Sequence, residues 1–160
     1  MPFDVISVKR NGKHAPFHTE KLHNGVRIYV GSSDFILPRG SHSYEIHYQT
    51  EDQLGHYDNY DEFYWNVTGT GWNFPIYKAS VTVFLPNDGR NQIMSQQFWT
   101  GYQGQTEQHA QLNNFEKSLG VTTTQALKPY QGLTIGLQLP KGVFLPRKTD
   151  PFGFVADNLA

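Results

Sequence analysis

The sequence predicts an all-β fold, an antiparallel β-sandwich of the immunoglobulin-like or a related kind, with roughly eight to ten short strands and at most one short helix. Aromatic residues make up 14% of the chain, and they are interleaved with Val, Ile and Thr, a composition typical of strands. Apolar and polar residues alternate in several short segments. Gly, Pro and Asn residues bracket these segments, which favours packed antiparallel sheets over alternating strands and helices.

The first strands are bounded by tight-turn residues. Residues 3–9 run into Asn11-Gly12, and residues 26–30 follow Asn24-Gly25. An Asn-Gly pair adopts the positive φ angles that a two-residue hairpin turn requires. A strand is therefore predicted beside each pair.

Residues 42–48 alternate with a period of two, as a strand does. One face carries His42, Tyr44, Ile46 and Tyr48, and the other carries Ser43, Glu45 and His47. Because the first face is the more aromatic and aliphatic one, we expect it to point inward.

Further strands are predicted where apolar residues alternate or cluster and then stop at Gly, Pro or Asn. They cover residues 63–67, 76–85, 93–102, 121–127 and 133–139. One segment, residues 107–119, has loosely helical apolar spacing and is followed by Gly120, so it is the single helical candidate.

A length of 160 residues suits one domain. We assign residues 1–145 to the β-sandwich and expect residues 146–160 to form an irregular tail. No internal repeat or charge-rich linker divides the sequence.

The composition excludes several classes of function. Lys and Arg total 13 against 14 Asp and Glu, which argues against nucleic-acid binding. The absence of cysteine excludes disulfides and thiolate chemistry. No apolar run approaches the roughly 20 residues that cross a bilayer, so the chain as given is expected to be soluble. Neither a nucleophile elbow nor a phosphate loop occurs, and no cofactor is expected.

The most polar cluster lies in residues 56–62, where Asp58, Asp61 and Glu62 provide three carboxylates. Such oxygen ligands suit calcium, and two acids across a cleft suit glycoside hydrolysis. The glycine and the glutamate spacing of a calcium loop are missing, so a polar loop between strands is the favoured interpretation. His14 and His18 are separated by Pro16, which also argues against a helical histidine metal site. We expect neither a metal site nor catalytic residues.

Aromatic side chains give a second candidate. Trp65, Trp72 and Trp99 could form a platform on which sugar rings stack. At strand-like positions, core burial is expected for at least two of the three tryptophans.

The segment DEFYWNVTGTGWNFPI at residues 61–76, followed by VTVFLP at 81–86, resembles the family of predicted bacterial membrane proteins that carry domain of unknown function 2207 (DUF2207). Supporting matches lie in residues 26–31, 44–48, 100–104 and 132–142, so the resemblance covers most of the chain.

The resemblance implies a secretion signal, a β-rich extracytoplasmic domain and then transmembrane helices. It brings no catalytic residues. This chain lacks the signal, the first strands and every membrane helix of that plan, while residues 157–159 are similar to the segment that precedes the first membrane helix. We therefore expect a piece of a protein that is tethered to the cell envelope through segments absent from this chain.

Three functions follow, in order of preference. The first is a non-catalytic module that binds an unknown envelope protein through its loops or a sheet edge. The alternative is carbohydrate binding through Tyr57, Tyr60, Trp72 and Trp99. The third is an acid-dependent hydrolase, which would require one of the acids in residues 58–62 to converge with His56 in a cleft and to have a perturbed pKa.

Overall fold

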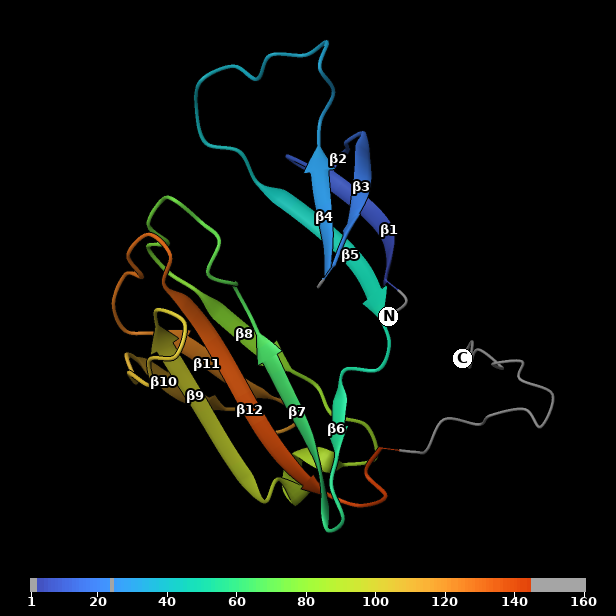
Figure 1. The fold of residues 1–160 in the computed structure, drawn as a ribbon, viewed down its shortest axis with the longest axis vertical. Helices are drawn as coiled ribbons and strands as arrows, with labels where there is room; N and C mark the ends of the chain where they lie inside the picture. Colours follow the sequence, from blue (N-terminus) through green and yellow to red (C-terminus); the bar gives the residue numbers. More distant parts are fainter. Residues whose placement is uncertain (1–2, 24, 145–160) are drawn as a thin grey trace, which may run out of the picture. The chain divides into compact units, whose positions relative to one another are not determined.

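The computed structural model describes residues 3–23 and 25–144, and within these ranges the regular structure is twelve strands and one 3-10 turn, Gly89–Gln92 (Figure 1). The predicted all-β class is confirmed. The chain divides into two compact units, one ending at Gln53 and one beginning at Leu54. The predicted tail, residues 146–160, lies outside the described residues.

The first unit contains a three-stranded antiparallel sheet and a two-stranded ribbon. The sheet has the order β2-β1-β5, and the ribbon pairs β3 with β4. Their bounds are β1 Phe3–Arg10, β2 Lys13–His14, β3 Phe17–Leu22, β4 Gly25–Val30 and β5 Tyr44–Thr50. The predicted Asn11-Gly12 hairpin joins β1 to β2, and both turn residues have positive φ angles, 50° and 77°.

The face of residues 42–48 that is expected to point inward is only partly covered. Tyr44, Ile46 and Tyr48 lie on one face of β5 but are 46%, 38% and 41% exposed. Within the described part of this unit, Val8 and Ala15 are the buried apolar residues. Val8 of β1 pairs with Ile46, lies on the same face and is fully buried, so this face is covered at β1 and left partly exposed along β5.

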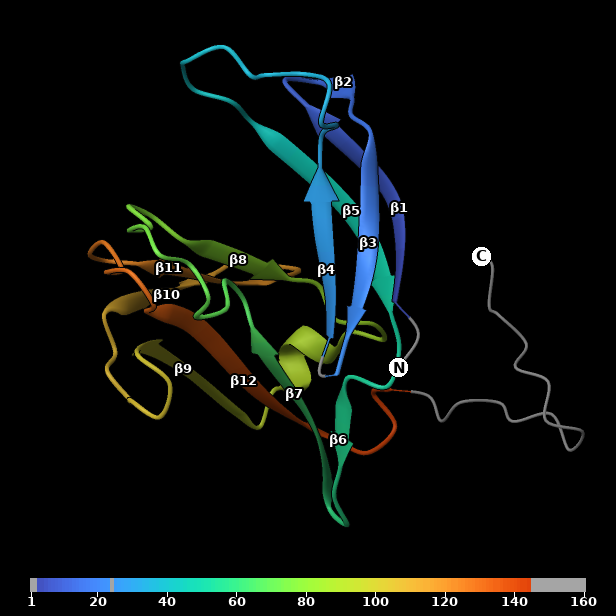
Figure 2. The ribbon, with the colours of Figure 1, turned by 45° about the horizontal axis from the view of Figure 1, so that its top comes forward.

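The second unit contains two antiparallel sheets, which Figures 1 and 2 show as two layers. The four-stranded sheet has the order β6-β7-β12-β9, and the three-stranded sheet has the order β10-β11-β8. Their bounds are β6 Leu54–His56, β7 Tyr60–Asn66, β8 Ser80–Val83, β9 Ser95–Gly101, β10 Ala110–Asn114, β11 Leu119–Thr123 and β12 Gly132–Pro140.

The core of the second unit takes side chains from both sheets. Leu133, Ile135, Leu137 and Leu139 of β12 are fully buried, and they share one cluster with Leu119 and Val121 of β11. Because side chains alternate along a strand, the other residues of β12 point to the opposite face of the four-stranded sheet. The immunoglobulin-like sandwich topology stays a prediction.

The helix predicted for residues 107–119 is wrong. Residues 110–114 form β10, which pairs with β11 through Leu112 opposite Val121. Ala110 and Leu112 pack against the core, a spacing of two that a strand shares with a loose helical pattern. Asn113 and Asn114 are poor helix formers, so pairing with β11 decides the conformation.

The other predicted strands are confirmed, with ends that differ by a few residues. The sequence patterns did not mark β2, β3, β6 or β10 as strands, so the described residues hold twelve strands and not eight to ten. Two of these extra strands are short: β2 contains two residues and β6 contains three.

Candidate functional site

The candidate site is the solvent side of the four-stranded sheet in the second unit, which we call the outer face. Its residues alternate with those that enter the core. They are Gly55 of β6, Tyr60, Glu62, Tyr64 and Asn66 of β7, Gly132, Thr134, Gly136 and Gln138 of β12, and Ser95, Gln97, Trp99 and Gly101 of β9.

Tyr64 and Trp99 form an aromatic pair at the centre of the outer face. Their ring centroids are 5.8 Å apart, with the planes inclined at 41°. Gly136 lies between their strands, opposite Tyr64 on β7. A Cβ atom at Gly136 would lie 3.1 Å from Cη2 and from Cζ3 of Trp99, so the indole rests on the glycine backbone. Tyr64 is 52% exposed, and the pair therefore presents ring surface to solvent.

Tyr57 and Tyr60 form a second pair at the turn between β6 and β7. The two rings stack with centroids 4.6 Å apart and planes inclined at 20°. The backbone N–H of Tyr57 donates to the carbonyl of Tyr60 at 3.0 Å, which closes the hairpin. A Cβ atom at Gly55 would lie 3.1 Å from Cε2 of Tyr57, so this ring also rests on a glycine.

Polar side chains lie between and beside the two pairs. Gln138 Nε2 donates to Glu62 Oε1 at 3.3 Å, and Thr134 Oγ1 donates to Asn66 Oδ1 at 2.7 Å. Glu62 stands on β7 between Tyr60 and Tyr64, on the same side of the strand. Among the outward positions of these four described strands there is no Lys or Arg.

Loops border the outer face at the end of the sheet where β7 and β9 finish. A Cβ atom at Gly132 would lie 2.8 Å from the carbonyl oxygen of Gly69, and one at Gly101 would lie 2.8 Å from Oε1 of Gln105. The loops that follow β7 and β9 therefore cross these two glycines and end the open surface.

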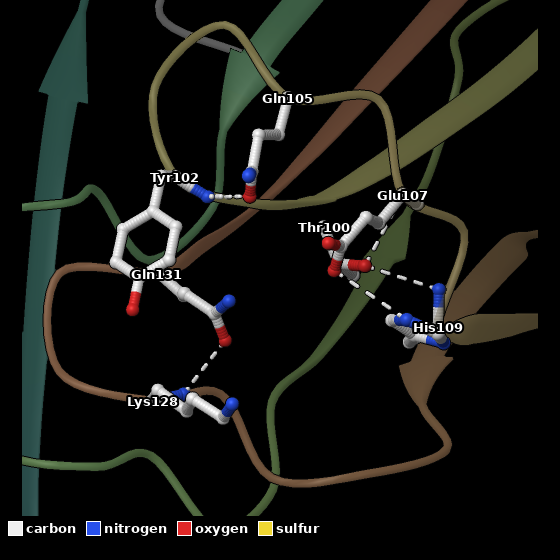
Figure 3. Close-up of polar contacts among 7 residues, drawn as sticks. All are labelled: Thr100, Tyr102, Gln105, Glu107, His109, Lys128 and Gln131. Atoms are coloured by element: carbon white, nitrogen blue, oxygen red, sulfur yellow. Dashed lines mark hydrogen bonds and ion pairs between the residues drawn. The ribbon is translucent and has the colours of Figure 1, made fainter.

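Hydrogen bonds from side chains to the backbone order the loop after β9 and the loop before β12 (Figure 3). Gln105 Oε1 accepts the Tyr102 N–H at 3.0 Å, and Gln131 Oε1 accepts the Lys128 N–H at 2.8 Å. The buried Thr100 hydroxyl accepts the His109 N–H at 3.0 Å. Each bond satisfies a backbone donor that a loop would otherwise leave to water.

The three tryptophans do not form one platform. Trp65 packs against the core, as expected. Trp72 lies in the loop after β7, where its Nε1 donates to the Thr68 carbonyl at 2.7 Å and its ring contacts Phe74. Trp99 lies on the outer face because its neighbour Phe98 takes the inward position. The expectation that at least two tryptophans enter the core is therefore wrong.

The acids of residues 58–62 do not converge. Asp61 points inward from β7 and is only 3% exposed, whereas Glu62 points outward and Asp58 lies in the turn. Among residues 3–23 and 25–144, no three His, Asp or Glu side chains are grouped so as to hold a metal ion. The three carboxylates of the calcium alternative therefore do not form one group.

Asp61 is a buried carboxylate that forms ion pairs with two partly exposed groups from other segments. Its Oδ1 accepts a hydrogen bond from Lys141 Nζ at 2.7 Å and one from His56 Nδ1 at 2.7 Å. The Lys141 ammonium, followed by His56, holds the pKa of the Asp61 carboxyl below its ordinary value of 3.8. The carboxyl is therefore ionised at neutral pH, the opposite of what a general acid requires.

A family model described as the N-terminal domain of predicted membrane proteins (DUF2207) matches residues 2–139. The chain belongs to the DUF2207 family. One relative is the uncharacterized protein YciQ of Escherichia coli (strain K12), which is 30% identical to this DUF2207 chain over 110 residues. The alignment covers 69% of the chain and 17% of YciQ. No solved structure matches.

The family description names a predicted membrane protein. Within the described part of this DUF2207 chain, no helix has the length and apolarity that a membrane crossing requires.

Tyr64, Gly136 and Gln138 are site residues that the sequence patterns did not indicate. Tyr64 could have been found, since it alternates with Phe63 and Trp65 in a predicted strand and must face away from them. Gly136 and Gln138 carry no local signal, because their place beside Trp99 and Glu62 depends on which strands pair with β12.

Proposed function

We propose that this DUF2207 chain is a non-catalytic carbohydrate-binding module whose binding surface is the outer face. The observation that carries the proposal is the Tyr64–Trp99 pair, held on the backbone of Gly136 with exposed ring surface. The C–H side of a pyranose ring is apolar, and a fixed aromatic plane offers it contact area at little entropic cost.

The polar groups around the rings fit the same kind of ligand. Sugar hydroxyls both donate and accept hydrogen bonds, and the outer face offers one carboxylate and several amides for them. Glu62, Asn66 and Gln138 already take part in bonds between strands, so their positions are fixed before a ligand arrives. Fixed polar groups beside exposed rings are the arrangement that gives a sugar site its selectivity.

We place the module on the extracytoplasmic side of the cell membrane, where envelope glycans are found. The family's description as a predicted membrane protein supports a membrane tether. The match spans only 17% of YciQ, so this tether belongs to our proposal for the whole protein.

Glycan binding is tested by titrating a panel of cell-wall and capsular glycans while recording tryptophan fluorescence and heat. Trp99→Ala and Tyr64→Ala are each expected to weaken binding by about fivefold, since ring contacts contribute on the order of 1 kcal/mol each. Tyr77→Ala is the matched control, because Tyr77 is an exposed tyrosine of the loop before β8. A wild-type chain that binds no glycan in the panel would refute the proposal.

A protein-binding module is the second candidate, and the first unit favours it. Tyr44, Ile46 and Tyr48 leave one face of β5 exposed and apolar, which is a common feature of protein contact surfaces. Capture from envelope extract should recover a reproducible partner with the wild-type chain and lose it with Ile46→Glu. The absence of any reproducible partner would count against this candidate.

A further inference from the structure

The two aromatic pairs lie in line along one strand of the outer face. Tyr60 and Tyr64 are four residues apart on β7, which corresponds to about 13 Å along a strand. Tyr57 extends the first pair over Gly55, and Trp99 extends the second over Gly136. A monosaccharide is much shorter than this separation, so a single sugar unit cannot contact both pairs.

We infer that the outer face binds an extended chain of uncharged sugar units, with one subsite on each aromatic pair. This inference rests on the proposed function and specifies its ligand. One unit stacks on Tyr64 and Trp99, another stacks on Tyr57 and Tyr60, and the units between them pass Glu62 and Gln138. The chain of sugar units follows β7, the strand between β6 and β12 in Figure 1.

The charge of the outer face selects against anionic polymers. Its described strand positions carry Glu62 and neither Lys nor Arg, and Asp58 adds a carboxylate at the β6–β7 turn. Phosphate or uronate groups would meet these carboxylates with no cation on the face to pair with. Neutral hydroxyl groups can instead donate to the Glu62 carboxylate, which has several acceptor positions.

The two ends of the outer face limit how many sugar units can contact it. Beyond Trp99, the loop atoms over Gly101 and Gly132 occupy the outer face. Beyond Tyr57 and Tyr60, the hairpin turn ends the sheet. Additional sugar units outside these two limits contact no aromatic pair, so affinity is expected to rise with chain length and then stay constant.

The inference is tested with chito-oligosaccharides and cello-oligosaccharides of two to eight units, and with polygalacturonate as the anionic polymer. The wild-type chain is expected to bind hexamers at least about tenfold more tightly than dimers, which corresponds to about 1.4 kcal/mol. No further gain is expected for the octamer, and polygalacturonate is expected not to bind. Because Tyr57→Ala with Tyr60→Ala removes one of the two subsites, it should lower the affinity for hexamers to about that for dimers, while Tyr77→Ala, outside the outer face, should leave the affinity for both unchanged.

Tyr60→Leu is a second variant that keeps apolar volume at the hairpin, in case the double alanine variant does not fold. It too should reduce the advantage of hexamers over dimers. Equal affinity for dimers and hexamers, or preference for polygalacturonate, would overturn the inference while leaving glycan binding intact. If no sugar of any length or charge binds, both this inference and the proposed function fail.

Discussion

At the scale of single residues, the alternation of side chains along β7 decides which of them point toward the core and which lie on the outer face. Asp61, Phe63 and Trp65 face inward, and Tyr60, Glu62, Tyr64 and Asn66 face outward. The acids that sequence analysis grouped together are thereby separated, because neighbours in a strand point to opposite sides. Their separation was predictable once the strand was known, whereas the Lys141 partner of Asp61 is 80 residues away and was not.

Asp61 makes the stability of the second unit dependent on pH. Its pKa is lowered in the folded chain, mainly by the hydrogen bond from Lys141. The folded state therefore binds the proton more weakly than the unfolded state does. The resulting stabilisation is complete well above the ordinary pKa of 3.8 and is lost as pH falls through the lower folded value.

We expect urea denaturation of the wild-type chain to show a steep loss of stability below about pH 4, and Asp61→Asn to flatten this slope. Lys141→Met should lower stability at pH 7 by about 1–3 kcal/mol, since it leaves a buried carboxylate with one partner fewer. Lys141→Arg keeps the charge and is the control. A slope that is unchanged in Asp61→Asn would show that other groups govern the acid response.

At the scale of elements, strands that end at a recognisable turn sequence could be predicted. Strands that form only because a neighbouring strand pairs with them could not. Asn11 and Gly12 specify their hairpin through positive φ angles, a property of the two residues themselves. Residues 110–114 are a strand because β11 lies beside them. The apolar residues of this segment fit both the helical and the strand period, and their loose helical spacing gave the wrong prediction of a helix.

A pair of substitutions in β10 checks its register. Leu112 packs against the core, and Leu112→Ala should cost about 2 kcal/mol. Gln111 is exposed on the other side of the strand, so Gln111→Ala should change stability by less than about 0.5 kcal/mol. Chemical shifts of residues 110–114 should be those of a strand, and helical shifts there would contradict the assignment.

At the scale of the whole molecule, the two units differ in how much apolar side chain they bury. Among the described residues, the buried apolar side chains of the first unit are Val8 and Ala15, and those of the second form one cluster of nine residues. The fold class followed from composition and alternation, but this division did not, because it depends on contacts between residues distant in the sequence. The assignment of residues 1–145 to one domain rests on length and on the absence of a repeat or a charge-rich linker, and it stays a prediction.

This difference predicts two levels of protection from hydrogen exchange. Amides of β11 and β12 flank the fully buried cluster and should exchange only when the second unit unfolds. Amides of β1 and β5 should exchange at least about tenfold faster, because a sheet with few buried side chains opens at a smaller free-energy cost. Mass spectrometry of deuterated peptides from the intact chain measures both sets at once. Equal protection in the two units would mean that they unfold together, and the outer face would then depend on the first unit for its stability.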